Sequence, residues 1–194
     1  MKHYALTGGI GSGKSTLLKM FQDIGIPTFS ADQEARHLMH KDQTLKAKIT
    51  DLLGADAYVD GKLNSSGITA KVFDNNTLLD KLNALVHPAV QREYAQWKAT
   101  QEAPYTVYEA AIVFEHQAQD RFDGTILVVS PEDIRIKRVR DRDGVSKASV
   151  MNRMKHQLTD AQKIPLADYL IENVTLSEMR RQLTELHQQL LVVS

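Results

Sequence analysis

A glycine-rich segment near the start of the chain limits most strongly what this sequence can fold into. Residues 8–15 read G-G-I-G-S-G-K-S, which satisfies the pattern G-x-x-x-x-G-K-[ST]. The apolar run at 4–7 predicts a buried strand that enters this segment. A helix is predicted from Lys14 to a stop at Gly25. Its apolar face, at helical spacing, consists of Leu17, Met20, Phe21 and Ile24.

The residue types in this segment are those that phosphate binding requires. Glycine reaches left-handed backbone conformations, which let successive N–H groups point inward at phosphate oxygens. The positive end of the helix dipole adds to the attraction. Lys14 is placed to reach the outer phosphates of a nucleotide, and the hydroxyl of Ser15 is suited to Mg²⁺. We therefore predict that this segment binds a nucleotide.

Strands and helices alternate in most of the remaining sequence. Further strands are predicted at 26–29, 105–108, 125–129 and 169–171. Ser130, followed by proline and two acids, is typical of a helix N-cap. A last helix is predicted, and its inward-facing residues are Leu176, Met179, Leu183, Leu186 and Leu190. This order favours an α/β fold with a parallel sheet covered by helices on both faces.

Helical patterns dominate the stretch between the second and third predicted strands. One helix is predicted to bury Leu45, Ile49 and Leu52 and to stop at Gly54. Two more are predicted on either side of a break at His87-Pro88. Residues 60–67 have the composition of turns. Because this stretch is too long for a plain crossover, we predict an inserted helical subdomain.

Composition and charge exclude several classes of protein. The 194 residues include 24 lysines and arginines and 24 aspartates and glutamates, a formal net charge of zero. This balance argues against a protein that coats nucleic acid or an anionic membrane. There is no cysteine, which excludes disulfides, thiolate metal sites and cysteine nucleophiles. Without a spanning segment or signal peptide, we expect a soluble cytoplasmic protein with no nucleic-acid, membrane or obligatory protein partner.

Kinases, GTPase switches and ATP-driven motors share such a phosphate-binding segment. The sequence has no N-K-x-D guanine signature and little room for the partner domain of a motor. Asp32 follows the second predicted strand, at the end of the sheet where ligands bind in open α/β folds. A carboxylate there would take or orient the proton of an attacking hydroxyl. The alternative is that Asp32 caps a helix that starts at Gln33.

A second candidate region is the basic segment 135–155. It has eight lysines and arginines against two aspartates, a net charge of plus six. We predict a lid that closes over a triphosphate, with a hinge-like turn at 143–144. The alternative, which we expect for most of its basic residues, is a solvated helix face. Glu109 and Glu115 are weaker candidates for facing a metal, with a surface or capping role as the alternative.

In combination, these motifs resemble the dephospho-coenzyme A kinase family. The series runs A-L-T-G-G-I-G-S-G-K-S-T at 5–16, G-I-P-x-x-x-A-D at 25–32 with A-R at 35–36, L-V-H-P at 85–88, R-D at 142–143, Gln157, and A-D-x-x-I-x-N at 167–173. It covers nearly the whole chain in the right order. The resemblance implies a P-loop kinase fold, similar to that of nucleoside monophosphate kinases, with a five-stranded parallel core. The core would comprise 1–32, 102–137 and 165–194, with a helical acceptor-binding subdomain at about 33–101 and a small lid at about 138–164.

The resemblance also implies an activity and a set of site residues. Members phosphorylate the 3′-hydroxyl of dephospho-coenzyme A with ATP, which completes coenzyme A synthesis in the cytoplasm. Asp32 would be the catalytic carboxylate, and Arg142 would be a lid arginine near the phosphates. His87 would belong to the acceptor side together with Asp32, and Asn173 would lie near the adenine. Mg²⁺ would be held by Ser15, and the ATP phosphates would be bound by Gly11, Ser12, Gly13, Lys14, Ser15 and Thr16.

Three positions depart from the family pattern. Ser30 stands where many members have aspartate, and Ala111 stands where proline is common. Ser130 follows its strand without the acidic residue that many members carry. These departures bear on fine positioning rather than on the reaction. Two other functions stay open at this point: another small-molecule or nucleotide kinase of the same fold, and a regulatory protein that hydrolyses ATP slowly.

Overall fold

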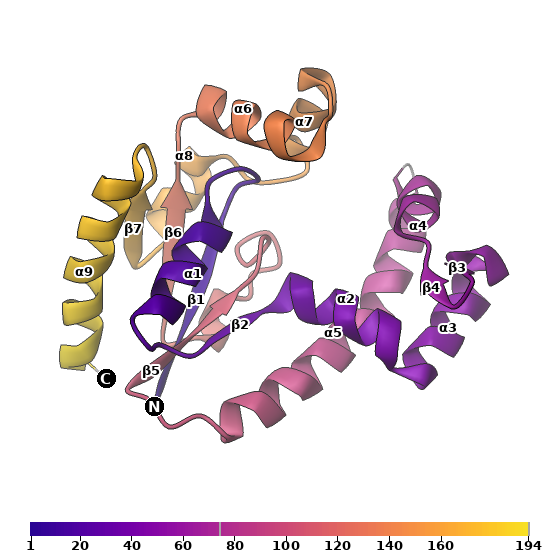
Figure 1. The fold of residues 1–194 in the computed structure, drawn as a ribbon, viewed down its shortest axis with the longest axis horizontal. Coiled ribbons are helices and arrows are strands. Elements are labelled where there is room, and N and C mark those ends of the chain that lie inside the picture. The colour runs from indigo at the N-terminus through magenta and orange to yellow at the C-terminus, as the bar shows by residue number, and fades with distance from the viewer. Residues whose placement is uncertain (74, 194) are drawn as a thin grey trace. The chain divides into compact units, whose positions relative to one another are not determined.

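The computed structural model describes residues 1–73 and 75–193 and consists of two compact units (Figure 1). The first unit combines residues 1–30 with 101–194, and the second comprises residues 31–100. The inserted subdomain expected from the sequence runs from 33 to 101. No helix within the described ranges has the length and apolar character that crossing a bilayer requires.

A five-stranded parallel sheet forms the centre of the first unit, as the sequence predicts. The strands are β1 (Lys2–Gly8), β2 (Thr28–Ser30), β5 (Tyr105–Glu109), β6 (Gly124–Val129) and β7 (Tyr169–Glu172). Their order across the sheet is β2-β5-β1-β6-β7. The central strand, β1, therefore delivers the glycine-rich segment to the middle of the carboxyl edge of the sheet.

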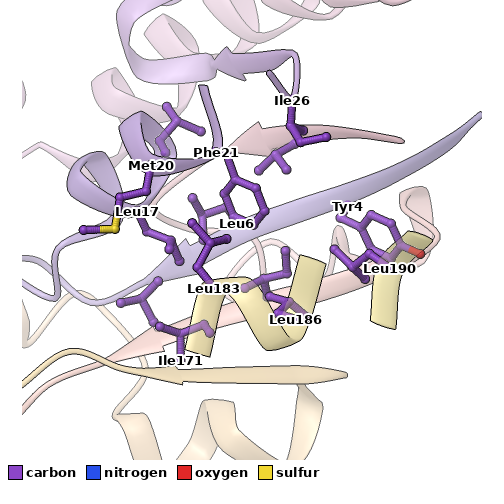
Figure 2. Close-up of a cluster of buried hydrophobic side chains, with 14 of the residues drawn as sticks. Tyr4, Leu6, Leu17, Met20, Phe21, Ile26, Ile171, Leu183, Leu186 and Leu190 are labelled. Carbon is purple, nitrogen blue, oxygen red and sulfur yellow. The ribbon is translucent and has the colours of Figure 1, made fainter. Parts of the chain in front are cut away.

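Helices α1 and α9 pack on the same side of this sheet and close its main core. The helices of the first unit are α1 (Lys14–Asp23), α6 (Glu132–Asp143), α7 (Lys147–Met154), α8 (Asp160–Lys163) and α9 (Leu176–Val193), with short 3₁₀ turns at Gln119–Arg121 and Ile164–Leu166. Figure 2 shows Leu6 of β1 between Phe21 of α1 and Leu183 of α9. Ile24 and Leu176, both predicted to face this core, are 44% and 57% exposed. Ile24 follows the last turn of α1 and Leu176 begins α9, so neither reaches the packed face.

The end of α1 follows the prediction. Gly25 takes a left-handed φ of +81°, donates its N–H to Gln22, and is followed by a bond from the N–H of Ile26 to the carbonyl of Phe21. This pair of bonds is a Schellman motif, which satisfies carbonyls that the helix leaves open. The motif turns the chain directly into β2.

The predicted cap of α6 is wrong. Pro131, not Ser130, occupies the N-cap position and no side chain caps the helix. The Ser130 hydroxyl donates instead to the carbonyl of Asn173, 2.8 Å away, and accepts from Arg138 at 3.1 Å. The Ser130 hydroxyl therefore links the ends of β6 and β7. This role depends on Asn173, which is far from Ser130 in the sequence.

The second unit is helical apart from one hairpin. Its elements are α2 (Ala31–Lys41), α3 (Gln43–Leu53), β3 (Tyr58–Val59), β4 (Lys62–Leu63), α4 (Ser65–Val72) and α5 (Asn76–Ala99), with a 3₁₀ turn at Ala55–Ala57. The hairpin turn has left-handed φ at both Asp60 and Gly61, as type I′ turns require. Leu53, rather than the predicted Leu52, joins Leu45 and Ile49 on the buried face of α3.

The predicted helix break at His87-Pro88 is also wrong, because α5 is one helix with Pro88 inside it. Proline removes one N–H donor from the helix. Buried residues on both sides of the proline, Val86 before it and Val90 after it, hold the two halves in one packed helix. Tertiary packing therefore overrides the local penalty.

A buried ion pair joins α8 to the loop after β5. Lys163 Nζ is fully buried and lies 2.8 Å from Glu115 Oε1. The angles at these two atoms are not those of a hydrogen bond, so the contact is an ion pair held by charge. The same oxygen accepts the N–H of Leu158 at 3.1 Å. Glu115 is therefore not the surface or capping acid allowed for in the sequence analysis.

We predict that Lys163→Met destabilises the fold by about 3 to 5 kcal/mol, because it leaves a largely buried carboxylate without its cation. Chemical denaturation measures the loss. The double variant Lys163→Met with Glu115→Gln removes both charges and keeps an acceptor for Leu158, so it should recover most of the stability. Wild-type stability in the single variant would contradict this prediction.

Candidate nucleotide-binding site

The loop between β1 and α1 has the backbone conformation of a phosphate cradle. Gly11 and Gly13 take φ values of +78° and +100°, which are left-handed. Gly13 is the N-cap of α1, and the N–H of Ser12 closes a turn on Gly9 at 3.1 Å. Across the described residues, the amides of Gly11, Gly13 and Ser15 donate to no protein acceptor. These donors at a helix N-terminus suit an anion.

Lys14 folds back over this loop. Its Nζ donates to the carbonyl of Gly8 at 2.8 Å and to that of Gly9 at 3.4 Å. The ammonium thus adds a full positive charge to a loop whose open amides already favour an anion. Ser15 and Thr16 follow in the first turn of α1 and are exposed. The residues predicted to bind ATP phosphates are brought together here.

Asn173, which follows β7, supports the loop. Its buried side chain donates from Nδ2 to the carbonyl of Ser12 at 2.7 Å. A Cβ on Gly13 would lie 1.9 Å from the same nitrogen, so the approach requires glycine. The amide of Asn173 thus holds the loop backbone, and its place near the adenine, which the resemblance implies, stays a prediction.

Helix α6 packs against the other side of the loop. A Cβ on Gly11 would lie 2.6 Å from the carbonyl oxygen of Arg135, and one on Gly9 would lie 2.2 Å from its Nη2. Neither of these two glycines is required by the sequence pattern. The close approach of α6 explains both of them.

The predicted lid arginine, Arg142, is paired with a carboxylate next to it. Its Nε and Nη2 donate to Asp143 at 2.7 and 3.1 Å, and Arg153 donates to the same carboxylate at 3.0 Å. The hydrogen bonds from Arg142, and then those from Arg153, hold the pKa of Asp143 below its usual range. Gly144, with a φ of +67°, ends α6 at this point, where the sequence predicts a turn.

Asp32 and His87, the two residues predicted on the acceptor side, belong to the second unit. Helix α2 begins at Ala31, so Asp32 lies in its first turn and not at its cap. Its side chain is exposed, as is that of His87 within α5. These positions leave both side chains accessible to a substrate.

One acidic residue has a clearer position than the sequence indicated. Glu109, at the carboxyl end of β5, is only 7% exposed and accepts a hydrogen bond from Ser30 at 2.7 Å. It lies in register with Leu6 of β1, two residues before the loop. A surface role for Glu109 is therefore wrong. Ser30, in place of the usual aspartate, supplies a donor where a second carboxylate would repel the first.

Comparison with known protein families shows which family this chain belongs to. The sequence profile of the family described as dephospho-CoA kinase matches residues 3–178. This chain belongs to the dephospho-CoA kinase family. The dephospho-CoA kinase of Salinibacter ruber is 38% identical over 192 residues, which cover 96% of each chain. That of Bacteroides fragilis is 30% identical over 169 residues, 87% of this chain and 82% of the relative.

Solved structures share the fold of this chain. A Thermus thermophilus crystal structure superposes with a TM-score of 0.88 at 29% identity, over 97% of this chain and 96% of the other. The Campylobacter jejuni dephospho-CoA kinase gives 0.63 at 19% identity, over 97% of both chains. A shikimate kinase from Bacteroides thetaiotaomicron gives 0.57 at 14% identity, over 97% of this chain and 98% of the other. The last two show the fold alone, which is that of P-loop kinases.

We predict that Gly11→Ala raises the dissociation constant for ATP at least about tenfold, because the new Cβ meets backbone that has little freedom to move away. Gly61→Ala is the matched control: its φ of +76° imposes similar strain, about 1 to 2 kcal/mol, with nothing within 4 Å. Calorimetric titration and thermal unfolding measure both effects. Equal ATP affinity in the two variants would refute the role assigned to the close approach.

Proposed function

We propose that this chain transfers the γ-phosphoryl group of ATP to the 3′-hydroxyl of dephospho-coenzyme A, forming coenzyme A and ADP. This reaction is the last step of coenzyme A biosynthesis, and we propose that it takes place in the cytoplasm. Family membership over residues 3–178 is the observation that carries the proposal. The preformed loop at 8–15 supports it, because phosphoryl transfer depends on positioning and charge stabilisation.

Residues of the first unit would hold the nucleotide. Residues 11–16 would bind the phosphates, with the open amides of Gly11, Gly13 and Ser15 facing the phosphate oxygens. Lys14 would exchange its carbonyl acceptors for the β- and γ-phosphates. Both groups neutralise charge that shifts towards the leaving oxygen as the γ-phosphoryl group departs. Interactions that strengthen along this path lower the barrier rather than only binding ATP.

The oxygen chemistry of the loop also fits a magnesium ion. Mg²⁺ prefers oxygen ligands and usually keeps several waters beside substrate phosphates. The Ser15 hydroxyl is exposed beside the cradle that Gly11 and Gly13 form. Within residues 1–73 and 75–193 no cluster of three acids or histidines is arranged to hold a metal. We propose that Ser15 holds Mg²⁺ together with the phosphates, where the ion would supply further neutralising charge.

Asp32 would serve the acceptor. Its carboxylate would take the proton of the attacking 3′-hydroxyl as the oxygen–phosphorus bond forms, while the bond from the γ-phosphorus to the bridging oxygen breaks and ADP leaves. Its exposed place in the first turn of α2 supports this role. Beyond Asp32, the second unit would hold the rest of dephospho-coenzyme A, with His87 among the contacting residues.

Arg142 would act from the lid, at about 138–164. In the structure it is bound to Asp143, which occupies the guanidinium with two oxygens much as a phosphate would. ATP would therefore compete with Asp143 for this side chain. Its exposed position supports such an exchange, because a solvated ion pair contributes little stability.

Product analysis tests the function and separates the alternatives. ADP formation should require dephospho-coenzyme A, and the product should carry a new 3′-phosphate. ATP turnover without any acceptor would indicate a regulatory ATPase. Equal kcat/KM for adenosine and dephospho-coenzyme A would overturn the substrate assignment, because adenosine has the hydroxyl but lacks the pyrophosphate and pantetheine arm that support the reaction through remote binding.

We predict that Asp32→Asn lowers kcat about a hundred- to ten-thousandfold, the usual contribution of a general base, with little change in either KM. Asparagine keeps the size of the side chain but cannot take up the proton. Asp51→Asn, an exposed carboxylate of α3, removes the same charge from the same unit and should be neutral. A fully active Asp32→Asn variant would show that the base is elsewhere.

A further inference from the structure

Ile10 occupies an unspecified position of the phosphate-loop pattern, yet the protein holds both of its backbone polar groups. Its N–H donates to Oε1 of Gln157 at 2.8 Å. Its carbonyl accepts from Nε of Arg135 at 3.0 Å. Arg135, in the first turn of α6, comes just before the predicted lid at about 138–164, and Gln157, in the segment after α7, lies within it.

A third residue, Asp160, joins Arg135 to the segment that carries Gln157. Nη1 of Arg135 lies 3.1 Å from each carboxylate oxygen of Asp160, three residues after Gln157. The side chain of Arg135 is only 8% exposed and that of Asp160 is 24% exposed, so the pair is partly buried. The planar guanidinium therefore spans the distance from the Ile10 carbonyl to Asp160, a geometry that lysine cannot reproduce.

The side chain of Ile10 points to the same partner. It packs against a small apolar cluster of α6 and α7 formed by Ile136, Val139 and Val150. Val139 follows Arg135 by one helical turn, so one face of α6 contacts both the backbone and the side chain of Ile10. The loop and the lid region thus meet at this one residue through three different kinds of contact.

From these contacts we infer that Arg135, Gln157 and Asp160 form a clamp that positions the phosphate loop and couples it to the lid region through Ile10. The inference rests on the proposed role of the loop in binding ATP. With the N–H and carbonyl of Ile10 occupied, the peptide on either side has a set orientation, and the following amides stay directed at the phosphates. Gly9 and Gly11, which the sequence pattern does not need, are the positions that let Arg135 come this close.

The clamp gives a role to Arg135. The sequence analysis placed this residue in the basic segment 135–155 and expected most of that segment's basic residues on a solvated helix face. Arg135 is a positioning residue, because its guanidinium contacts the loop backbone and Asp160. Its effect should therefore appear in ATP binding and not in acceptor binding. A residue that only stabilised the fold would change neither constant in the molecules that remain folded.

Titration of the full-length chain with ATP tests the clamp. Arg135→Met and Gln157→Met each remove one bond to Ile10, and each should raise the ATP dissociation constant about tenfold while the KM for dephospho-coenzyme A stays unchanged. Lys137→Met is the matched control, since it removes a charge from α6 at an exposed residue that pairs with Asp141 of the same helix. It should bind ATP as the wild type does.

Amide hydrogen exchange at Ile10 gives a readout independent of activity. Gln157→Met should speed exchange at this amide, and the double variant with Arg135→Met should weaken ATP binding by less than the product of the single effects, because both bonds orient one residue. Gln157 is only half-buried, so its variant carries the test if Arg135→Met does not fold.

The outcomes separate two failures. Wild-type ATP affinity in folded Arg135→Met or Gln157→Met would overturn the clamp and leave the proposed function intact. An equal rise in the KM for dephospho-coenzyme A would also overturn it, because the effect would then not belong to the loop. A wild-type chain that does not bind ATP would overturn the proposed function and the clamp together.

Discussion

Backbone amides that converge on an anion repel one another when the anion is absent, and a phosphate loop must therefore be held in shape by the protein around it. In this chain the holding groups contact the loop carbonyls and one amide, and they leave other amides open. Asn173 holds the carbonyl of Ser12, and Arg135 and Gln157 hold Ile10. The loop is thus organised before ATP arrives, and binding need not supply the free energy to shape it.

The order of strands determines which residues can act in this way. Strand β1 lies between β5 and β6, so the ends of its neighbours flank the loop. Glu109 ends β5, and Ser130 follows β6 and is bonded to the residue after β7. Parallel strands place all these ends at one edge, which is where open α/β sheets bind ligands. The main core on the side of α1 and α9 keeps that edge in register.

Carboxylates within and just after the basic segment 135–155 pair with its arginines, and the pairs differ in how buried the arginine is. Asp160 pairs with the buried Arg135, whereas Asp143 pairs with Arg142 and Arg153, which are both exposed. The pair of a buried arginine is costly to break, because the buried charge would be left without a partner. Exposed pairs exchange partners at little cost. Arginine therefore holds the loop at the base of α6, and under the proposed function another arginine, Arg142, would meet phosphate at the far end of this helix.

Short-range sequence patterns determined much of the fold of this protein. The phosphate loop, the helix after it, the Gly25 stop and the parallel sheet all follow from short-range patterns, because glycine conformations, caps and apolar spacing act over a few residues. The sequence by itself also placed the chain near its family. Only the tertiary structure decided that α5 continues through Pro88, that Ser130 bonds to a strand end, and that Arg135 and Gln157 hold Ile10. The last two bonds join residues 125 and 147 positions apart, and no local pattern records which distant partner will satisfy a polar group.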